Sequence, residues 1–362
     1  MKLRRHLPAL PTRSAFSARA VGSFAAVALT ASGVLAGSAT AAHADGTTNY
    51  TYVTLNNSSD YTFNQLLGIN NSGIIAGYFG SGMAEHPNKG YQLLPPRYRQ
   101  EDYRVENFPG SNQTQVTGLN NTATQVGFQS PTNTGTDPDY GWYSLDNGRH
   151  FVQVNVPLPS GFSPNSTPVT QFLGVNDIDI AVGFENDSVG NAHGFEYYIP
   201  TGQVLFTSVE GSSSVTDAAI NNHDQVAGFF TPTASGAQSV EGFLTTRHGT
   251  ITLAVPGASS TMATGVNDSG EVVGVYTTGS GSTAQNFGFT WAQNGGFTTI
   301  DDPNGTGTTT VNGINDRGDL VGFYVDGDGN TDGMLVTPNP QQAQNITNSP
   351  QSTTLTATAT TM

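Results

Sequence analysis

Residues 313–324 read GINDRGDLVGFY, and five related stretches occur earlier in the chain. In every copy an Asn is followed seven residues later by a Gly, whereas the copies themselves lie 50, 56, 45, 46 and 48 residues apart. A fixed internal spacing with a variable outer spacing indicates a rigid unit joined by loops. The repeated pairs are Asn70 and Gly77, Asn120 and Gly127, Asn176 and Gly183, Asn221 and Gly228, Asn267 and Gly274, and Asn315 and Gly322.

Each unit is predicted to be a β-hairpin. The residues before the Asn are strand-like, and Asn-Asp-x-Gly or Asn-Asn-x-Gly then supplies the turn, because Asn bonds its own backbone and Gly accepts a positive φ. The run that follows, such as residues 319–321, is apolar or β-branched and is typical of a return strand. The Gly before the aromatic residue, such as Gly322, removes a side chain where we expect another backbone to approach.

Two further strands complete each repeat. One begins with Gly and an aromatic residue, as at Gly90 and Tyr91, and the next alternates and often ends in Pro, as at residues 251–256. Four strands in about 48 residues match a propeller blade, so the sequence predicts an all-β fold, a six-bladed β-propeller of six four-stranded repeats. A β-solenoid, whose repeat is usually shorter, and a β-sandwich, which is less regular, are the alternatives.

The order of strand types bears on closure. The chain opens with a strand of the Pro-ending type at residues 50–55 and finishes with the Gly-aromatic type at residues 333–337. If a blade begins with a strand other than the Pro-ending one, one blade must combine strands from both ends of the chain. That pairing would hide sheet edges and tie the two ends together.

Residues 1–44 have the pattern of a secretory signal peptide. A basic segment without acidic residues precedes an apolar stretch from Val21 to about Ala36, and residues 42–44 form an A-x-A cleavage pattern. The apolar stretch is too short and too often interrupted to span a membrane stably. We therefore expect bacterial export, cleavage near Ala44, a secreted extracellular protein and no membrane span.

The rest of the chain divides into two parts. Residues 45–338 carry the repeats and are predicted to form the propeller. Residues 339–362 are rich in Ser, Thr, Asn and Gln, and we expect this tail to be disordered.

Composition limits the partners. Without residues 1–44, seven Lys and Arg side chains face 27 Asp and Glu side chains, which gives a net charge of −20. An acidic surface repels phosphate backbones, so we expect no nucleic-acid partner. The chain contains no Cys, which excludes disulfides, thiolate metal sites and a Cys nucleophile. We expect a monomer.

The phrase G-I-N-D-x-G-x-x-V-G-x-Y, followed by G-F and F-x-x-I-D-x-P, resembles the HAF family of extracellular repeats. The resemblance covers about residues 50–338 and is most specific in the copies at Gly265 and Gly313. It is looser in the copy at Gly118, which lacks the turn Gly, and only His193 keeps the His of the family's His-x-Phe triplet. The resemblance implies an exported repeat protein, and the family carries no established activity.

One loop resembles a cation site. Oxygen ligands at alternate positions, separated mostly by Gly, match the first half of a calcium loop, although Thr337 stands where such a loop has a bidentate Glu. These residues could bind calcium, and no other cofactor is expected; the alternative is an ordinary hairpin loop. The candidate ligands are Asp326, Asp328, Asn330 and Asp332.

Other chemistry has weaker support. No G-x-S-x-G elbow occurs, and the histidines, from His86 to His248, are scattered without metal-binding spacing, although loops of several blades could bring them together. Carboxylates for glycoside hydrolysis are plentiful but show no pattern. The aromatic residues Trp142, Tyr143, Tyr197 and Tyr198 are candidates for stacking on sugars, with core packing as the alternative.

These observations favour a non-enzymatic binding or surface-interaction module that recognises polysaccharide or another cell-surface polymer through loops on one propeller face. A secreted hydrolase or lyase acting on such polymers is the first alternative, and a purely structural extracellular protein is the second. Two or three carboxylates with a His at one end of the axis would favour the enzyme. A face lined only by Asn, Ser, Thr and Gly would favour binding, since the fold itself does not decide.

Overall fold

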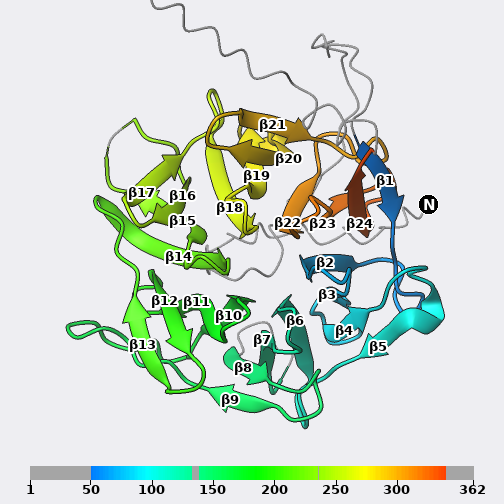
Figure 1. Cartoon of the computed structure of the whole chain (residues 1–362), viewed down its shortest axis with the longest axis horizontal. Coiled ribbons are helices and arrows are strands. Elements are labelled where there is room, and N and C mark those ends of the chain that lie inside the picture. Colours follow the sequence, from blue (N-terminus) through cyan, green and yellow to red (C-terminus); the bar gives the residue numbers. More distant parts are fainter. Residues whose placement is uncertain (1–49, 133–137, 235, 340–362) are drawn as a thin grey trace, which may run out of the picture.

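A computed structural model of the chain describes residues 50–132, 138–234 and 236–339. Its strands form six four-stranded antiparallel sheets around a central axis, which confirms the predicted six-bladed β-propeller (Figure 1). These ranges contain no α-helix, and their two helical segments are single 3-10 turns at Gln100–Asp102 and Gly281–Thr283. The predicted signal peptide and nearly all of the predicted tail lie outside the described residues.

We number the blades in chain order and give the strands of each from the axis outward. Blade 1 contains β2 (Asn64–Ile69), β3 (Ile75–Phe79), β4 (Lys89–Leu93) and β5 (Tyr103–Val105). Blade 2 contains β6 (Gln113–Leu119), β7 (Gln125–Ser130), β8 (Tyr140–Ser144) and β9 (Val152–Val154). Blade 3 contains β10 (Thr170–Val175), β11 (Ile180–Asn186), β12 (Ala192–Tyr198) and β13 (Gln203–Phe206).

The second half of the ring repeats this plan. Blade 4 contains β14 (Ser212–Ile220), β15 (Val226–Pro232), β16 (Glu241–Thr246) and β17 (Gly249–Leu253). Blade 5 contains β18 (Ser260–Val266), β19 (Val272–Thr278), β20 (Gln285–Ala292) and β21 (Gly296–Ile300). Blade 6 contains β22 (Thr310–Ile314), β23 (Leu320–Val325), β24 (Thr331–Pro338) and β1 (Tyr50–Thr54).

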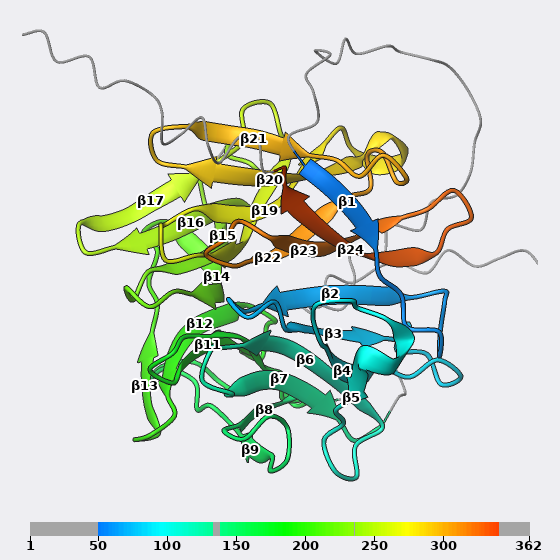
Figure 2. The same cartoon turned by 45° about the vertical axis from the view of Figure 1, so that its right-hand side comes forward.

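Blade 6 is assembled from both ends of the described chain. Strand β1 pairs antiparallel with β24 from Tyr50 opposite Pro338 to Thr54 opposite Met334. The two strands lie side by side in both views (Figures 1 and 2). The outer strand of the last blade therefore comes from the start of the propeller, which gives the closure that the strand order allows.

Every innermost strand carries a β-bulge at the same place. In β2 the register against β3 shifts between Leu66 and Gly68, and the five other innermost strands shift at the equivalent residues. A bulge adds one residue and bends the strand. The bend is therefore part of every repeat, although the sequence pattern does not predict it.

The core lies between blades. Between blades 6 and 1, for example, the buried side chains of Leu55, Ile75, Tyr91 and Val321 belong to one cluster. The aromatic residue of the third strand is fully buried in blades 1 to 5, which explains the repeated Gly-aromatic pair. No helix within the three described ranges is long and apolar enough to cross a membrane.

Candidate functional site

The repeated Asn follows the innermost strand in all six blades and folds the turn after it. Asn221 is typical: its Oδ1 accepts hydrogen bonds from the backbone amides of His223 and Gln225, both at 3.0 Å. A side-chain oxygen that replaces a backbone acceptor stabilises such a turn locally. The predicted role of Asn in the turn is therefore confirmed.

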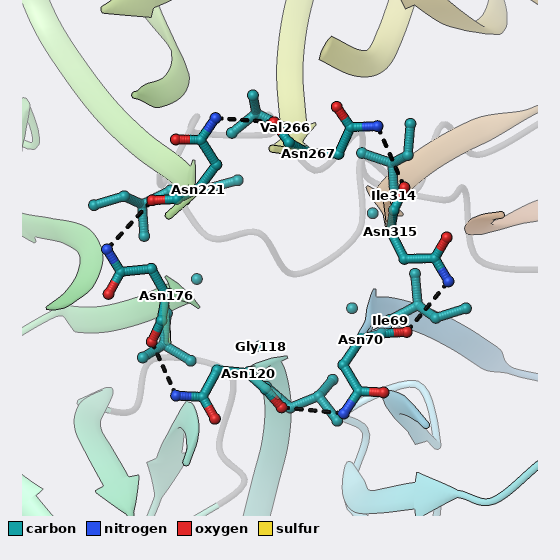
Figure 3. A pocket seen from close by; sticks show the side chains of 18 of the residues that line it. Ile69, Asn70, Gly118, Asn120, Asn176, Asn221, Val266, Asn267, Ile314 and Asn315 are labelled. Carbon is teal, nitrogen blue, oxygen red and sulfur yellow. Dashed lines mark hydrogen bonds between the residues drawn. The ribbon is translucent and has the colours of Figure 1, made fainter. Parts of the chain in front are cut away.

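The other end of each Asn side chain reaches the next blade. Nδ2 of Asn221 donates to the backbone carbonyl of Asn267 at 2.9 Å, and Asn315 in blade 6 donates to Asn70 in blade 1 at 3.2 Å. All six make this bond, so the amides form a closed ring around the axis (Figure 3). All six ring residues are buried. We call them the Asn ring, and the end of the propeller that carries them the Asn-turn face.

The residue after each ring Asn forms a second closed ring. The backbone amide of each member donates to the side-chain Oδ1 of the member in the next blade, at 2.8–2.9 Å. Three members are amides and three are carboxylates, and all are exposed or half-buried. We call this set the mixed ring; its members are Asn71, Asn121, Asp177, Asn222, Asp268 and Asp316.

The carboxylates of the mixed ring are held at both oxygens. Oδ2 of Asp177 accepts from Nδ2 of Asn121 at 2.9 Å and from Nδ2 of Asn222 at 3.0 Å. Oδ2 of Asp268 likewise accepts from Nδ2 of Asn222, and Oδ2 of Asp316 accepts from Nδ2 of Asn71. The sequence predicts only turn chemistry at this position, because a ring between copies is not visible in any single copy.

A narrow cavity of about 110 Å³ follows the axis beneath the two rings. Its wall contains Gly68 and the matching small residues of the other blades, whose backbones nearly touch; a Cβ on Gly118 would lie 2.9 Å from the carbonyl oxygen of Leu173. The residues that line the cavity are Leu, Ile, Val, Ala, Gly, Thr, Asn and Asp. The pattern of carboxylates with a His that would favour an enzyme is not found in this lining.

The second repeated residue, the Gly seven positions after the Asn, lies where two strands come close together. A Cβ on Gly77 would lie 2.3 Å from the carbonyl oxygen of Gln65 in β2, and one on Gly274 would lie 2.0 Å from that of Met262 in β18. The other four repeated glycines have the same contact at 1.9–2.1 Å. The predicted close backbone approach is confirmed, and its role is structural.

The loop proposed for calcium is a closed hairpin between β23 and β24. Oδ1 of Asp326 accepts from the backbone amides of Asp328 and Asn330, and Oδ2 accepts from Nδ2 of Asn330 at 3.0 Å. Asp332 is buried in β24, and its Oδ1 accepts from Nδ2 of Asn56 at 2.6 Å. In the described part of the chain, no three His, Asp or Glu side chains are placed to hold a metal ion. Calcium binding here remains a prediction.

The histidines do not converge. His86 lies 2.7 Å from Asp60, His193 lies 3.1 Å from Asp187, and His150 bonds Asp146, so three of them form separate pairs in different blades. Burial opposes ionisation of Asp187, but hydrogen bonds from His193 and two backbone amides outweigh it and lower the pKa of that carboxyl. These pairs fix local loops.

The aromatic candidates belong mainly to the core. Trp142 is completely buried and stacks edge-on against Phe151, so its ring cannot lie against a sugar in solvent. Tyr143 and Tyr197 are partly buried against the cluster between blades 2 and 3, and Tyr198 packs against the next cluster. The core interpretation is confirmed for Trp142.

Buried carboxyls were not foreseen from the sequence. Asp217 in β14 has no exposed surface; burial raises its pKa to about 8, although a bond from Thr207 at 2.5 Å lowers it in part. Burial likewise raises the pKa of Glu106 to about 8 and that of Glu185 to about 7. Comparison of the copies could have found Asp217, because four residues before the ring Asn the other blades have Leu66, Val116, Phe172, Ala263 and Val311.

No protein-family model matches the sequence, and no curated protein matches it either. The resemblance to HAF repeats therefore remains a prediction.

Solved structures with a similar fold include a streptogramin B lyase, with 11% identity and a TM-score of 0.42 over 80% of this chain and 98% of that one. A family PL25 ulvan lyase has 11% identity and a TM-score of 0.43 over 75% and 77%. The six-bladed fungal lectin of Aleuria aurantia has 9% identity and a TM-score of 0.39 over 80% and 96%. At these identities the similarity concerns the fold alone.

Proposed function

We propose that this protein is an exported, non-enzymatic binding module of HAF-repeat type that recognises polysaccharide or another cell-surface polymer. The observation that carries the proposal is the mixed ring, six amide and carboxylate side chains fixed around the axis on the Asn-turn face. Their neighbours hold them in place while part of each remains open to solvent. Preorganised polar groups bind hydroxyl-rich ligands with little loss of entropy.

The bonding of these carboxylates supports binding over hydrolysis or elimination. Each carboxylate accepts hydrogen bonds from a backbone amide and from an Asn side chain, so it is already engaged at both oxygens. A general acid or base needs a titratable group within reach of the reacting atom, and the cavity lining contains no His or Glu. The acidic composition, with 27 Asp and Glu against 12 Lys and Arg, favours neutral or cationic partners over nucleic acid.

The test uses the purified chain on an array of polysaccharides and cell-wall fractions, once with calcium and once with a chelator. Selective binding supports the proposal, and loss of that binding on chelation supports the calcium loop as well. If no fraction is bound under either condition, polymer recognition is excluded and the purely structural role is favoured.

A matched pair of variants locates the binding face. Asp316→Asn removes one charge from the mixed ring while keeping Oδ1 as an acceptor, and we expect the affinity for the bound fraction to change several-fold. Glu210→Gln, in the exposed loop between β13 and β14 at the opposite end of the propeller, is the control. Equal behaviour of the two variants would remove the mixed ring from the site.

A further inference from the structure

A position in the second strand also breaks the symmetry of the six blades. Five residues after the ring Asn, the second strand has a fully buried side chain that faces the preceding blade, and in blade 2 this residue is Gln125. Neither Oε1 nor Nε2 of Gln125 has a hydrogen-bond partner among the described residues. The equivalent residues of the other blades are apolar: Ile75, Ala181, Val226, Val272 and Leu320.

Gln125 lines a pocket of about 300 Å³ between blades 1 and 2, on the Asn-turn face. Ser72 and Ile74 form the blade 1 wall, and Thr122 and Asn147 belong to the blade 2 wall. The backbone amide of Asn147 donates to the carbonyl of the neighbouring turn at 3.0 Å, which fixes that wall. A volume of this size is at the lower end of small-molecule sites. We call it the blade 1–2 pocket.

A second polar residue replaces an apolar one at the same interface. The backbone amide of Glu106 donates to the carbonyl of Gly90 in β4, and the equivalent residues Leu55 and Leu253 belong to apolar clusters between blades. Oε2 of Glu106 has no partner in the described ranges, and a Cβ on Gly148 would lie 2.7 Å from the carboxyl carbon. Burial raises the pKa of Glu106 to about 8, so the group is neutral at pH 7. It lies against the loop that carries Asn147.

Two more buried donors at this interface lack acceptors within the described structure, Nε2 of Gln92 and Nε1 of Trp142. The strand registers place Gln92 beside Ala76 on the face of blade 1, and Trp142 packs against Ala76 from blade 2. Buried polar groups are normally hydrogen-bonded. Unpaired groups of four residues therefore gather at one interface, and of these residues Gln125 also lines the blade 1–2 pocket, where an external molecule can complete its bonding.

We propose that the blade 1–2 pocket binds one neutral sugar residue through two adjacent hydroxyl groups, and that the carboxamide of Gln125 turns from its buried position into the pocket to become the central contact. A carboxamide offers an acceptor and donors side by side, and each hydroxyl of a vicinal diol both donates and accepts. Ser72, Thr122 and Asn147 add neutral hydrogen-bonding groups, and Ile74 offers an apolar surface. The ligand is neutral because the wall carries no charged side chain and the chain itself has a net charge of −15. This inference rests on the proposed function and names its ligand class.

The experiment uses the full chain and a panel of glucose, galactose and mannose as probes. The chain has two tryptophans, so Trp291→Phe leaves Trp142 as the sole reporter at the interface. We expect one hexose to change the Trp142 emission in a saturable way. Gln125→Ile, which introduces the residue of blade 1, should weaken binding at least tenfold and raise the melting temperature by about 2–4 °C. Val272→Ile, at the equivalent position of blade 5, is the control and should leave sugar binding unchanged.

Three results would overturn the inference. The first is that no hexose binds, and the second is that Gln125→Ile lowers the melting temperature and leaves sugar binding intact. The third is that N-methylacetamide, an amide without hydroxyl groups, saturates the change in Trp142 emission where the sugars do not. The array distinguishes this inference from the broader proposal. If wild type and Gln125→Ile bind the same polymer equally, polymer recognition stands and the pocket is excluded. If a hexose binds but no polymer does, the pocket stands and polymer recognition is excluded.

Discussion

At the scale of single residues, the ring Asn acts in two directions. Its oxygen organises the turn of its own blade, while its amide group bonds the backbone of the next blade. Asp would keep the first function and lose the second, and Ser would be too short for the second. The sequence predicts the turn, because the turn is local. It does not predict the ring, because the acceptor lies about one repeat away in the chain.

Replacing one ring residue should destabilise the whole propeller. Asn221→Ala removes three bonds inside its turn and the bond to Asn267, and we expect the free energy of unfolding to fall by about 2–4 kcal/mol, since each buried bond contributes about 1 kcal/mol. Urea denaturation followed by fluorescence measures this change. His223→Ala, in the same turn but exposed, should cost less than about 0.5 kcal/mol. Similar losses for the two variants would contradict the role of the ring.

Asp217 should make stability depend on pH. Its pKa is about 8 in the folded chain because burial disfavours the charged form, whereas the ordinary value is 3.8. Between these two values the folded state binds more protons than the unfolded state, so its contribution to stability is complete below pH 3.8 and falls as pH rises toward 8.

The neutral variant Asp217→Asn isolates this contribution, because its amide oxygen can still accept from Thr207. Relative to wild type, we expect its free energy of unfolding to increase with pH from 5 to 8, on the order of 1 kcal/mol per pH unit. Glu106 and Glu185 titrate in both chains and cancel in the difference. A difference that stays constant over this range would show that Asp217 is ionised in the folded state.

At the scale of strands, the repeated Gly and the bulge belong together. The bulge directly follows the part of the innermost strand whose backbone carbonyl comes so close to the second strand that only Gly leaves enough space. The sequence predicts four strands and one close approach in each repeat, because strand periodicity and turn residues are local patterns. The bulge cannot be predicted in this way, since the bulged position has residues as different as Leu67, Thr117 and Asn312. Nor can the position of Gln125, whose orientation toward blade 1 depends on how two blades pack.

A methyl group on the second strand tests this geometry. Gly274→Ala would place Cβ 2.0 Å from the carbonyl oxygen of Met262, so the hairpin must separate, and we expect a loss of about 3 kcal/mol or more. Gly327→Ala is the matched control, because a Cβ there meets nothing within 4 Å and the residue has no positive φ. Melting temperatures of both chains provide the measurement. A Gly274→Ala chain as stable as the control would mean that the two strands are not in such close contact.

At the scale of the whole molecule, six similar blades close into a ring through two devices. Hydrogen bonds of the Asn ring and the mixed ring connect every blade to the next on the Asn-turn face. At the rim, β1 completes blade 6 and joins the first strand of the propeller to the last. The strand order in the sequence is compatible with this closure but does not show which four strands form one blade. Only the pairing of β1 with β24 decides that question.

The closure predicts that the first strand is needed for stability although it has only five residues. A chain that starts at Asn56 lacks β1 and Leu55, which leaves β24 as an open edge and removes a buried side chain from the cluster between blades 6 and 1. An exposed edge strand pairs with other chains, so we expect a lower melting temperature and oligomers in size-exclusion chromatography. A chain that starts at Thr47 keeps β1 and is the control. Should the shorter chain remain monomeric and melt like the control, the Asn and mixed rings alone would be enough to hold the six blades together.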